Sequence, residues 1–119
     1  MFELAEKWRL PLVFFTEGGG GRPGDTDGIG IAGLDVFAFN YFAKLSGLVP
    51  LVGNTTGRSF AGNAGLHACC DEINANDGSN NVVGGPAKIE GGGLGVIRPE
   101  EVGPMTVQVP NCVLDIPVA

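Results

Sequence analysis

Short apolar runs alternate with amphipathic stretches along this chain, a pattern that indicates an α/β layer structure. Residues 1–9 are typical of the end of a helix, which Pro11 terminates. Residues 12–15 (LVFF) form a continuous apolar run, which predicts a strand buried on both faces. Residues 49–53 (VPLVG) and residues 70–76 predict the next two strands.

The clearest helix is predicted between residues 34 and 48. At 100° per residue, most of its apolar side chains fall within an arc of roughly 140°. These side chains are Leu34, Phe37, Ala38, Tyr41, Phe42, Leu45 and Leu48. Val36 and Phe39 lie outside the arc, so we expect this helix to have a second packing surface.

Three further segments have weaker patterns. The small residues of 60–69 predict a short, tightly packed helix. Pro86 is well placed to start a helical turn, which the glycines at 91–93 would end. The tail, residues 105–118, predicts two short β segments, MTVQV and VLDIPV.

Glycine is the compositional outlier, with 21 among 119 residues, and its clustering excludes a collagen-like chain. A formal net charge of −6 argues against nucleic-acid binding, and the apolar runs are too short to span a membrane. The N-terminus lacks the pattern of a secretion signal. Cys69, Cys70 and Cys112 form a poor disulfide framework without zinc spacing. We therefore expect a cytoplasmic protein without a metal site.

The glycine loop at residues 17–33 contains G-x-G-x-x-G at Gly19, Gly21 and Gly24, directly after a predicted strand. A dinucleotide-binding fold needs a helix to begin inside that motif, but the proline and aspartates that follow oppose one. Two interpretations stay open. The loop is either a turn that only requires positive φ, or a place where bare glycine amides approach a ligand oxygen.

The side chains offer no credible acid–base machinery. His67, the only histidine, sits among small residues, and we expect it to be packed or partly exposed rather than catalytic. Cys69 and Cys70 are expected to be core residues rather than nucleophiles. Backbone N–H groups at the two glycine-containing turns, 17–33 and 54–59, can stabilise an oxyanion without any titrating side chain.

Four long strings resemble the carboxyltransferase (beta-type) subunits of biotin-dependent acyl-CoA carboxylases, the acetyl-/propionyl-CoA carboxylase family. They are LAEKWRLPLVFFTEGGGGRPGDTD (4–27), GRSFAGNAGLHACCD (57–71), GGPAKIEGGGLG (84–95) and PEEVGPMTVQVPN (99–111). The resemblance covers essentially the whole chain. It implies a crotonase-like fold, a spiral of β-β-α units, with residues 1–119 as a single segment from one half of a full carboxyltransferase.

The resemblance also implies an activity, which is the transfer of carboxylate from carboxybiotin to the α-carbon of an acyl-CoA through backbone oxyanion holes. The biotin is carried on a partner protein and is not attached to this chain. The implied partners are acyl-CoA, the biotin carboxyl carrier protein, biotin carboxylase and further copies of the chain in a homo-oligomer.

Site residues follow from the resemblance by position. Gly62, Asn63 and Ala64 resemble the oxyanion-hole turn at a helix start. The loop that lines the acyl-CoA pocket corresponds to Gly19, Gly20, Gly21 and Arg22, and Gly84 and Gly85 lie in the stretch that borders that pocket. Arg22 and Arg58 are candidates for the CoA phosphates, with an ordinary loop arginine as the alternative for each.

One departure from the family has a period of two. The family reads close to CCDVIIATE where this chain reads CCDEINAND, which places Glu72, Asn74 and Asn76 on one strand face. Burying that face unpaired would be costly, so we expect it to meet water or polar groups. Two hypotheses result: a carboxyltransferase segment that acts with other chains, or a catalytically incomplete crotonase-like fragment that only folds and oligomerises.

Overall fold

The structure, a computed structural model, describes residues 1–19 and 37–119. Within these residues, the larger sheet has four parallel strands in the order β1-β2-β4-β6. Its strands are β1 (Leu12–Phe15), β2 (Leu51–Thr55), β4 (Glu72–Asn76) and β6 (Ile116–Val118). A smaller parallel sheet pairs β3 (Arg58–Phe60) with β5 (Asn80–Val82).

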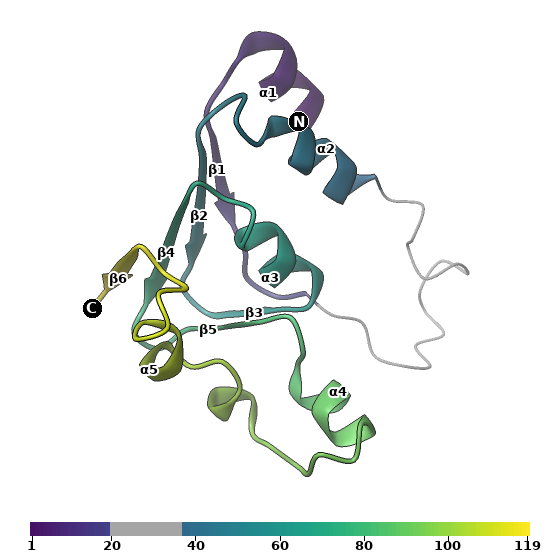
Figure 1. Cartoon of the computed structure of the whole chain (residues 1–119), viewed down its shortest axis with the longest axis vertical. Helices are drawn as coiled ribbons and strands as arrows, with labels where there is room; N and C mark the ends of the chain where they lie inside the picture. The colour runs from purple at the N-terminus through teal and green to yellow at the C-terminus, as the bar shows by residue number, and fades with distance from the viewer. Residues whose placement is uncertain (20–36) are drawn as a thin grey trace.

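The helices follow the strands in a repeating order (Figure 1). They are α1 (Phe2–Trp8), α2 (Ala38–Leu45), α3 (Gly62–His67), α4 (Pro86–Gly91), the 3-10 helix η1 (Pro99–Glu101) and α5 (Met105–Gln108). A strand of the larger sheet, a strand of the smaller sheet and a helix occur in succession as β2-β3-α3 and again as β4-β5-α4. The β-β-α order expected from the family resemblance is therefore present.

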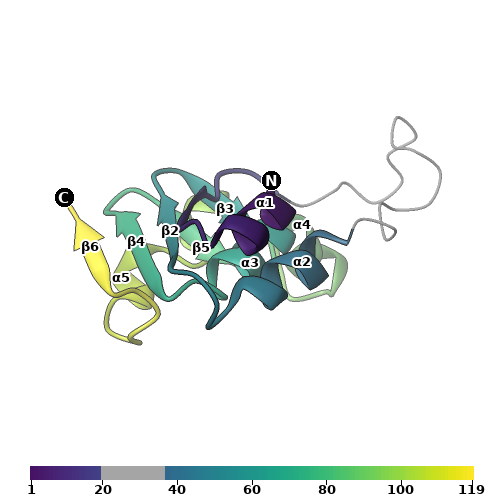
Figure 2. The ribbon, with the colours of Figure 1, turned by 90° about the horizontal axis from the view of Figure 1, so that it is seen from above.

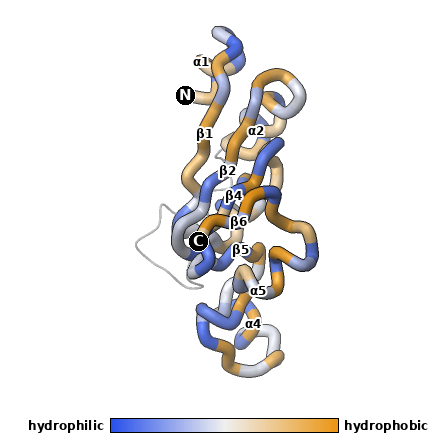
Figure 3. Tube along the Cα trace, turned by 90° about the vertical axis from the view of Figure 1, so that its left-hand side faces the viewer, coloured by the Kyte–Doolittle hydropathy of each residue, from blue (hydrophilic) through white to orange (hydrophobic). Residues whose placement is uncertain are grey.

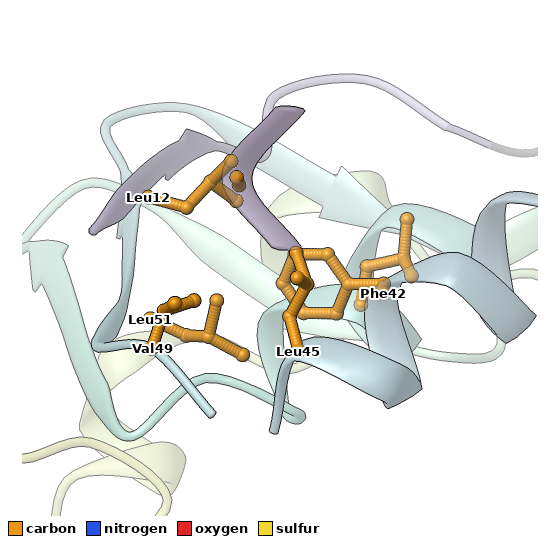
Figure 4. Packing of buried hydrophobic residues seen from close by; sticks show 7 residues of the cluster. Leu12, Phe42, Leu45, Val49 and Leu51 are labelled. Carbon is orange, nitrogen blue, oxygen red and sulfur yellow. The ribbon is translucent and has the colours of Figure 1, made fainter. Parts of the chain in front are cut away.

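The main core lies between the larger sheet and the helices on one of its faces (Figures 2 and 4). Phe42 and Leu45 of α2 are fully buried and pack with Leu12, Val49 and Leu51. The Phe42 ring also contacts the rings of Phe2 and Phe14, with both pairs of centroids 5.5 Å apart. This cluster holds α1 and α2 against β1 and β2, as the apolar arc of the predicted helix required for Phe42 and Leu45. Phe37, also in the predicted arc, is 66% exposed and precedes the first residue of α2.

A second, smaller core lies under β4. Ala75 is buried with Met105 and Leu114, and Ile73 packs against them. Ile73 and Ala75 alternate with Glu72 and the two asparagines along β4, so one strand face is apolar and the other is polar.

The outer face of the larger sheet is open in the described part of the chain, and Figure 3 looks onto its strands. Val13 and Phe15 of β1 are 56% and 66% exposed, so the prediction that residues 12–15 are buried on both faces was wrong. The physical reason is that α1 and α2 cover one face only. Glu72 and Asn74 are part-exposed, and the Asn74 amide donates to Glu72 Oε1 at 2.9 Å. The expected polar contact is therefore present between Asn74 and Glu72, whereas Asn74 Oδ1 is buried without a partner among the described residues.

Other strand predictions need correction. Residues 105–108 form α5 and not a strand. Pro104 is the N-cap, and its carbonyl accepts hydrogen bonds from the N–H groups of Val107 and Gln108. The sequence did not predict β3 or β5, because RSF and NNV lack an apolar run or alternation. Residues 34–36 of the predicted helix lie outside the described residues.

Gly53 on β2 provides a test of the packing between the sheet and α3. A Cβ at this position would overlap the His67 ring and lie 3.0 Å from Cys70 Sγ. We expect Gly53→Ala to lower the free energy of unfolding by about 1–3 kcal/mol, measured by urea denaturation. Gly78→Ala is the matched control, because nothing lies within 4 Å of its Cβ position. Equal effects of the two substitutions would contradict this account of Gly53.

Candidate functional site

The chain continues from β1 directly to the edge of the smaller sheet. Gly18 forms a parallel bridge with Ser59, in which Gly18 N–H donates to the Arg58 carbonyl at 2.6 Å and Phe60 N–H donates to the Gly18 carbonyl at 2.9 Å. The start of the first glycine loop is thus fixed to β3, three residues before α3 begins. The carboxyl ends of β1 and β3 meet at this point.

Gly19 is in contact with the turn into α3. Its φ is +92°, and a Cβ there would overlap the Phe60 carbonyl oxygen and lie 3.0 Å from Asn63 Cβ. Only glycine combines this backbone conformation with so close an approach. The Asn63 amide also donates to the Glu17 carbonyl at 3.0 Å. The start of the first glycine loop and the turn into α3, which the family resemblance indicated, therefore pack against each other.

The turn into α3 is sharp. Ala61, the N-cap, has φ 54° and ψ −122°, a strained conformation for a residue with a side chain. Its N–H donates to the Val82 carbonyl at 3.1 Å, which ties the turn to β5. The first helical hydrogen bond is donated by Gly65 to the Ala61 carbonyl, and no described residue accepts from the N–H groups of Gly62, Asn63 and Ala64. Three backbone donors are thus available at this turn.

Phe39 of α2 lies on the same turn. Its Cζ is 3.3 Å from the position that a Gly62 Cβ would occupy, and its Cε1 is 3.6 Å from the corresponding position at Gly65. The two glycines, three residues apart on α3, leave a flat surface for the ring. This contact is the second packing surface that the position of Phe39 outside the helical arc predicted.

The predicted segment at Gly84 and Gly85 reaches the site through Phe60. Gly85, the N-cap of α4, lies with its Cβ position 3.8 Å from the Phe60 ring, while nothing lies within 4 Å of the Cβ position of Gly84. The structure therefore brings Gly19, the start of α3 and Gly85 together around Phe60. Gly20, Gly21 and Arg22 lie outside the described residues.

Glu17 is a site residue that the sequence reasoning missed. Its Oε1 accepts hydrogen bonds from the Thr56 N–H at 2.7 Å and the Thr56 hydroxyl at 2.6 Å, and these bonds hold the pKa of the carboxyl below its ordinary value. The carboxylate thereby links the loop after β1 to the turn after β2. The sequence offered one signal for Glu17, because it lies just after a predicted strand and directly before the glycines.

The titratable side chains near α3 do not provide an acid–base pair. His67 is fully buried, and this burial lowers the pKa of its imidazole below the ordinary value of 6.5. The Gly53 backbone, the Asn81 side chain and the charge of Glu17 raise the pKa, but by less than burial lowers it. Burial raises the pKa of the Cys70 thiol to about 11. The packed interpretations of His67 and Cys70 are confirmed, whereas Cys69 is exposed and is not a core residue.

Two absences hold for residues 1–19 and 37–119. No group of three or more His, Cys, Asp and Glu side chains there could hold a metal ion. None of the helices in these ranges is long and apolar enough to cross a membrane. The Arg58 side chain forms an ion pair with Glu100, which favours its interpretation as a structural loop arginine.

The contact between the two turns can be tested with a pair of glycines. Gly18 and Gly19 both have positive φ, but only Gly19 has neighbours within 4 Å of its Cβ position. Alanine at either position incurs the backbone strain, so the difference between the two variants reports the contact. We expect Gly19→Ala to lower the urea midpoint more than Gly18→Ala, and to shift the Asn63 amide resonance. Equal midpoints would contradict the contact.

The buried imidazole predicts a pH dependence with a defined sign. Because burial lowers the pKa of His67 in the folded state, the unfolded chain binds more protons just below pH 6.5. The free energy of unfolding should therefore fall as the pH drops below 6.5, by up to about 1.4 kcal/mol per pH unit. NMR titration of the single histidine checks this directly. A midpoint at or above 6.5 in the folded protein would contradict it.

No protein-family model and no curated protein matches the sequence. Among solved structures, a single-chain, multi-domain long-chain acyl-CoA carboxylase aligns with 98% of this chain at 56% identity and a TM-score of 0.87. The transcarboxylase 12S, solved with hydrolysed methylmalonyl-coenzyme A bound, aligns at 23% identity and a TM-score of 0.80. The beta subunit of geranyl-CoA carboxylase from P. aeruginosa aligns at 21% identity and a TM-score of 0.73.

These structures are all longer than the chain described above. The alignments cover 98% of this chain but 11%, 23% and 22% of those three chains, respectively. The two structures below 25% identity support the fold, and the first supports the sequence resemblance as well. The chain is therefore similar along almost its whole length to a short segment of an acyl-CoA carboxylase, with the crotonase-like fold of the carboxyltransferase part of these enzymes.

Proposed function

We propose that residues 1–119 form a single crotonase-like segment of an acyl-CoA carboxylase carboxyltransferase and bind the thioester of an acyl-CoA. The N–H groups of Gly62, Asn63 and Ala64 would donate to the thioester oxygen as negative charge develops on it. The observation that carries this proposal is the contact of Gly19 with Phe60 and Asn63, because it fixes the turn that presents these donors.

The physical basis is electrostatic preorganisation. Backbone donors held in place before reaction need no reorientation when charge develops, and one such donor can contribute about 2.7–4 kcal/mol to transition-state stabilisation. The strained φ of Ala61 and the bond from its N–H to Val82 hold the backbone in this arrangement. A site of this kind requires no general base from the chain, which agrees with the buried His67 and the raised pKa of Cys70.

The remaining predicted residues would surround the acyl-CoA. Gly19, Gly20, Gly21 and Arg22 would line the pocket, and Gly84 and Gly85 would border it. Support for Gly85 comes from its contact with Phe60, and support for Gly84 from the open space around its Cβ position. Bare backbone at these positions would let the ligand approach closely.

Biotin on a carrier protein supplies the carboxyl group when it is bound next to this site. The chain spans 11% of the long-chain acyl-CoA carboxylase, so the carrier, the biotin carboxylase and the rest of the carboxyltransferase would come from elsewhere in the assembly. Further copies of the chain would complete a homo-oligomer. The three free thiols fit a reducing, cytoplasmic compartment. An acyl-CoA substrate would place the chain in fatty acid metabolism.

A second candidate function is a folded, oligomerising segment without turnover. The exposed Val13 and Phe15 on the open face of β1 favour it, because such apolar side chains gain from being covered by another chain. In this alternative the amides of α3 would bind no thioester.

Ligand titration separates the two functions. Butyryl-CoA and free CoA share every group except the acyl thioester, so their difference isolates the carbonyl. In ¹⁵N-labelled protein we expect butyryl-CoA to shift the amide resonances of Gly62, Asn63 and Ala64 downfield, with saturation in the millimolar range. Calorimetry measures the same binding independently.

The controls are internal to the spectrum. The Gly78 amide, in the turn between β4 and β5, should not shift with either compound, and free CoA should leave residues 62–64 unchanged. Absence of heat and of amide shifts up to millimolar butyryl-CoA would overturn thioester binding by this chain and favour the segment without turnover.

A further inference from the structure

A cluster of polar side chains is buried on the inner side of α3. Ser59 and His67 have no exposed surface, and Thr55 and Asn81 are 1% and 5% exposed. Five of their polar atoms have no hydrogen-bond partner among the described residues. These atoms are Thr55 Oγ1, Ser59 Oγ, both ring nitrogens of His67 and Asn81 Oδ1.

The four side chains are neighbours in the fold. Ser59 and Asn81 are register partners on the adjacent parallel strands β3 and β5, and both are buried, so they lie on the same face. The Asn81 side chain and the Gly53 backbone lie close enough to the His67 ring to raise its pKa, but neither meets a ring nitrogen in hydrogen-bond geometry. The ring edge packs on Gly53. Thr55 is two residues after Gly53 on the same buried face of β2. The cluster thus lies between α3 and both sheets.

Buried polar atoms without partners are costly and rare in folded proteins. Polar sites lined by several such atoms are where internal water molecules are held, typically through about three hydrogen bonds each. The cluster provides both donors and acceptors. The hydroxyls of Ser59 and Thr55 can do either, a neutral imidazole offers one of each, and Asn81 Oδ1 accepts.

We propose that the space between α3, β2 and the β3-β5 sheet is an internal hydration site, in which at least one bound water bridges His67 to Ser59 and Asn81. The water accepts from one partner and donates to the others, so that the ring nitrogen facing it is paired while the imidazole stays neutral. The site does not depend on the proposed function. It would position α3, and therefore the Gly62–Ala64 turn, against the sheets through water, beside the apolar contact that Leu66 of α3 makes with the main core.

Two buried serines test the proposal as a matched pair. Ser59 is 0% exposed without a partner among the described residues, while Ser79 is 1% exposed and donates to the Asn76 carbonyl at 2.7 Å. If water pairs the Ser59 hydroxyl, Ser59→Ala should lower Tm by about 3–6 °C, as Ser79→Ala should. If the site is dry, Ser59→Ala removes an unpaired polar atom and should leave Tm unchanged or raise it.

A second measurement uses the unaltered protein. The single histidine gives ring-proton resonances that can be assigned directly, and a water held beside them cross-relaxes with them over nanoseconds or longer. We expect nuclear Overhauser effects between water and the His67 ring protons, with the same sign as the effects between protons of the protein interior. The absence of such effects, or a Tm for Ser59→Ala at or above that of the unsubstituted protein, would overturn the proposal.

Discussion

The close approach of two backbone segments determines the arrangement of the site. Gly18 joins the end of β1 to β3, and Gly19 then lies so near the Phe60 carbonyl that no side chain fits. This contact links the larger sheet to the smaller one and holds the first glycine loop against the start of α3. A side chain at residue 19 would force the two turns apart, and the donors of the α3 turn would lose their fixed neighbour.

Two clusters of different chemistry lie on the inner face of the larger sheet. The apolar cluster around Phe42 and Leu51 fastens the helices to β1 and β2, while the polar cluster around His67 lies between α3 and the sheets. Apolar contact tolerates small shifts, because it is not directional. Hydrogen bonds restrict orientation more tightly. The polar cluster is therefore suited to setting the direction of α3 rather than only its distance.

The sequence predicted the elements that carry apolar patterns and missed those that do not. The runs at 12–15 and 49–53 and the arc through Phe42 led to β1, β2 and α2, because burial against a layer requires such patterns. β3 and β5 have no pattern of their own, since their residues are fixed by pairing and by polar contacts. The α3 turn was reached through the family resemblance, whereas the role of Glu17 depends on Thr56, 39 residues away, which no local pattern encodes.

The open sheet face shows how far this chain has diverged from an entirely apolar layer. One edge of the face carries Val13 and Phe15 on β1, and the other carries Ile116 and Val118 on β6. The interior strand β4 carries Glu72 and Asn74. Asn74 lies opposite Asn54 in the register with β2, so the polar residues form a continuous strip across two strands. A covering layer that is apolar throughout would leave this strip unpaired, at a cost for each buried amide or carboxylate. The edges favour apolar contact and the centre favours water or polar partners, so a layer over this face must combine both.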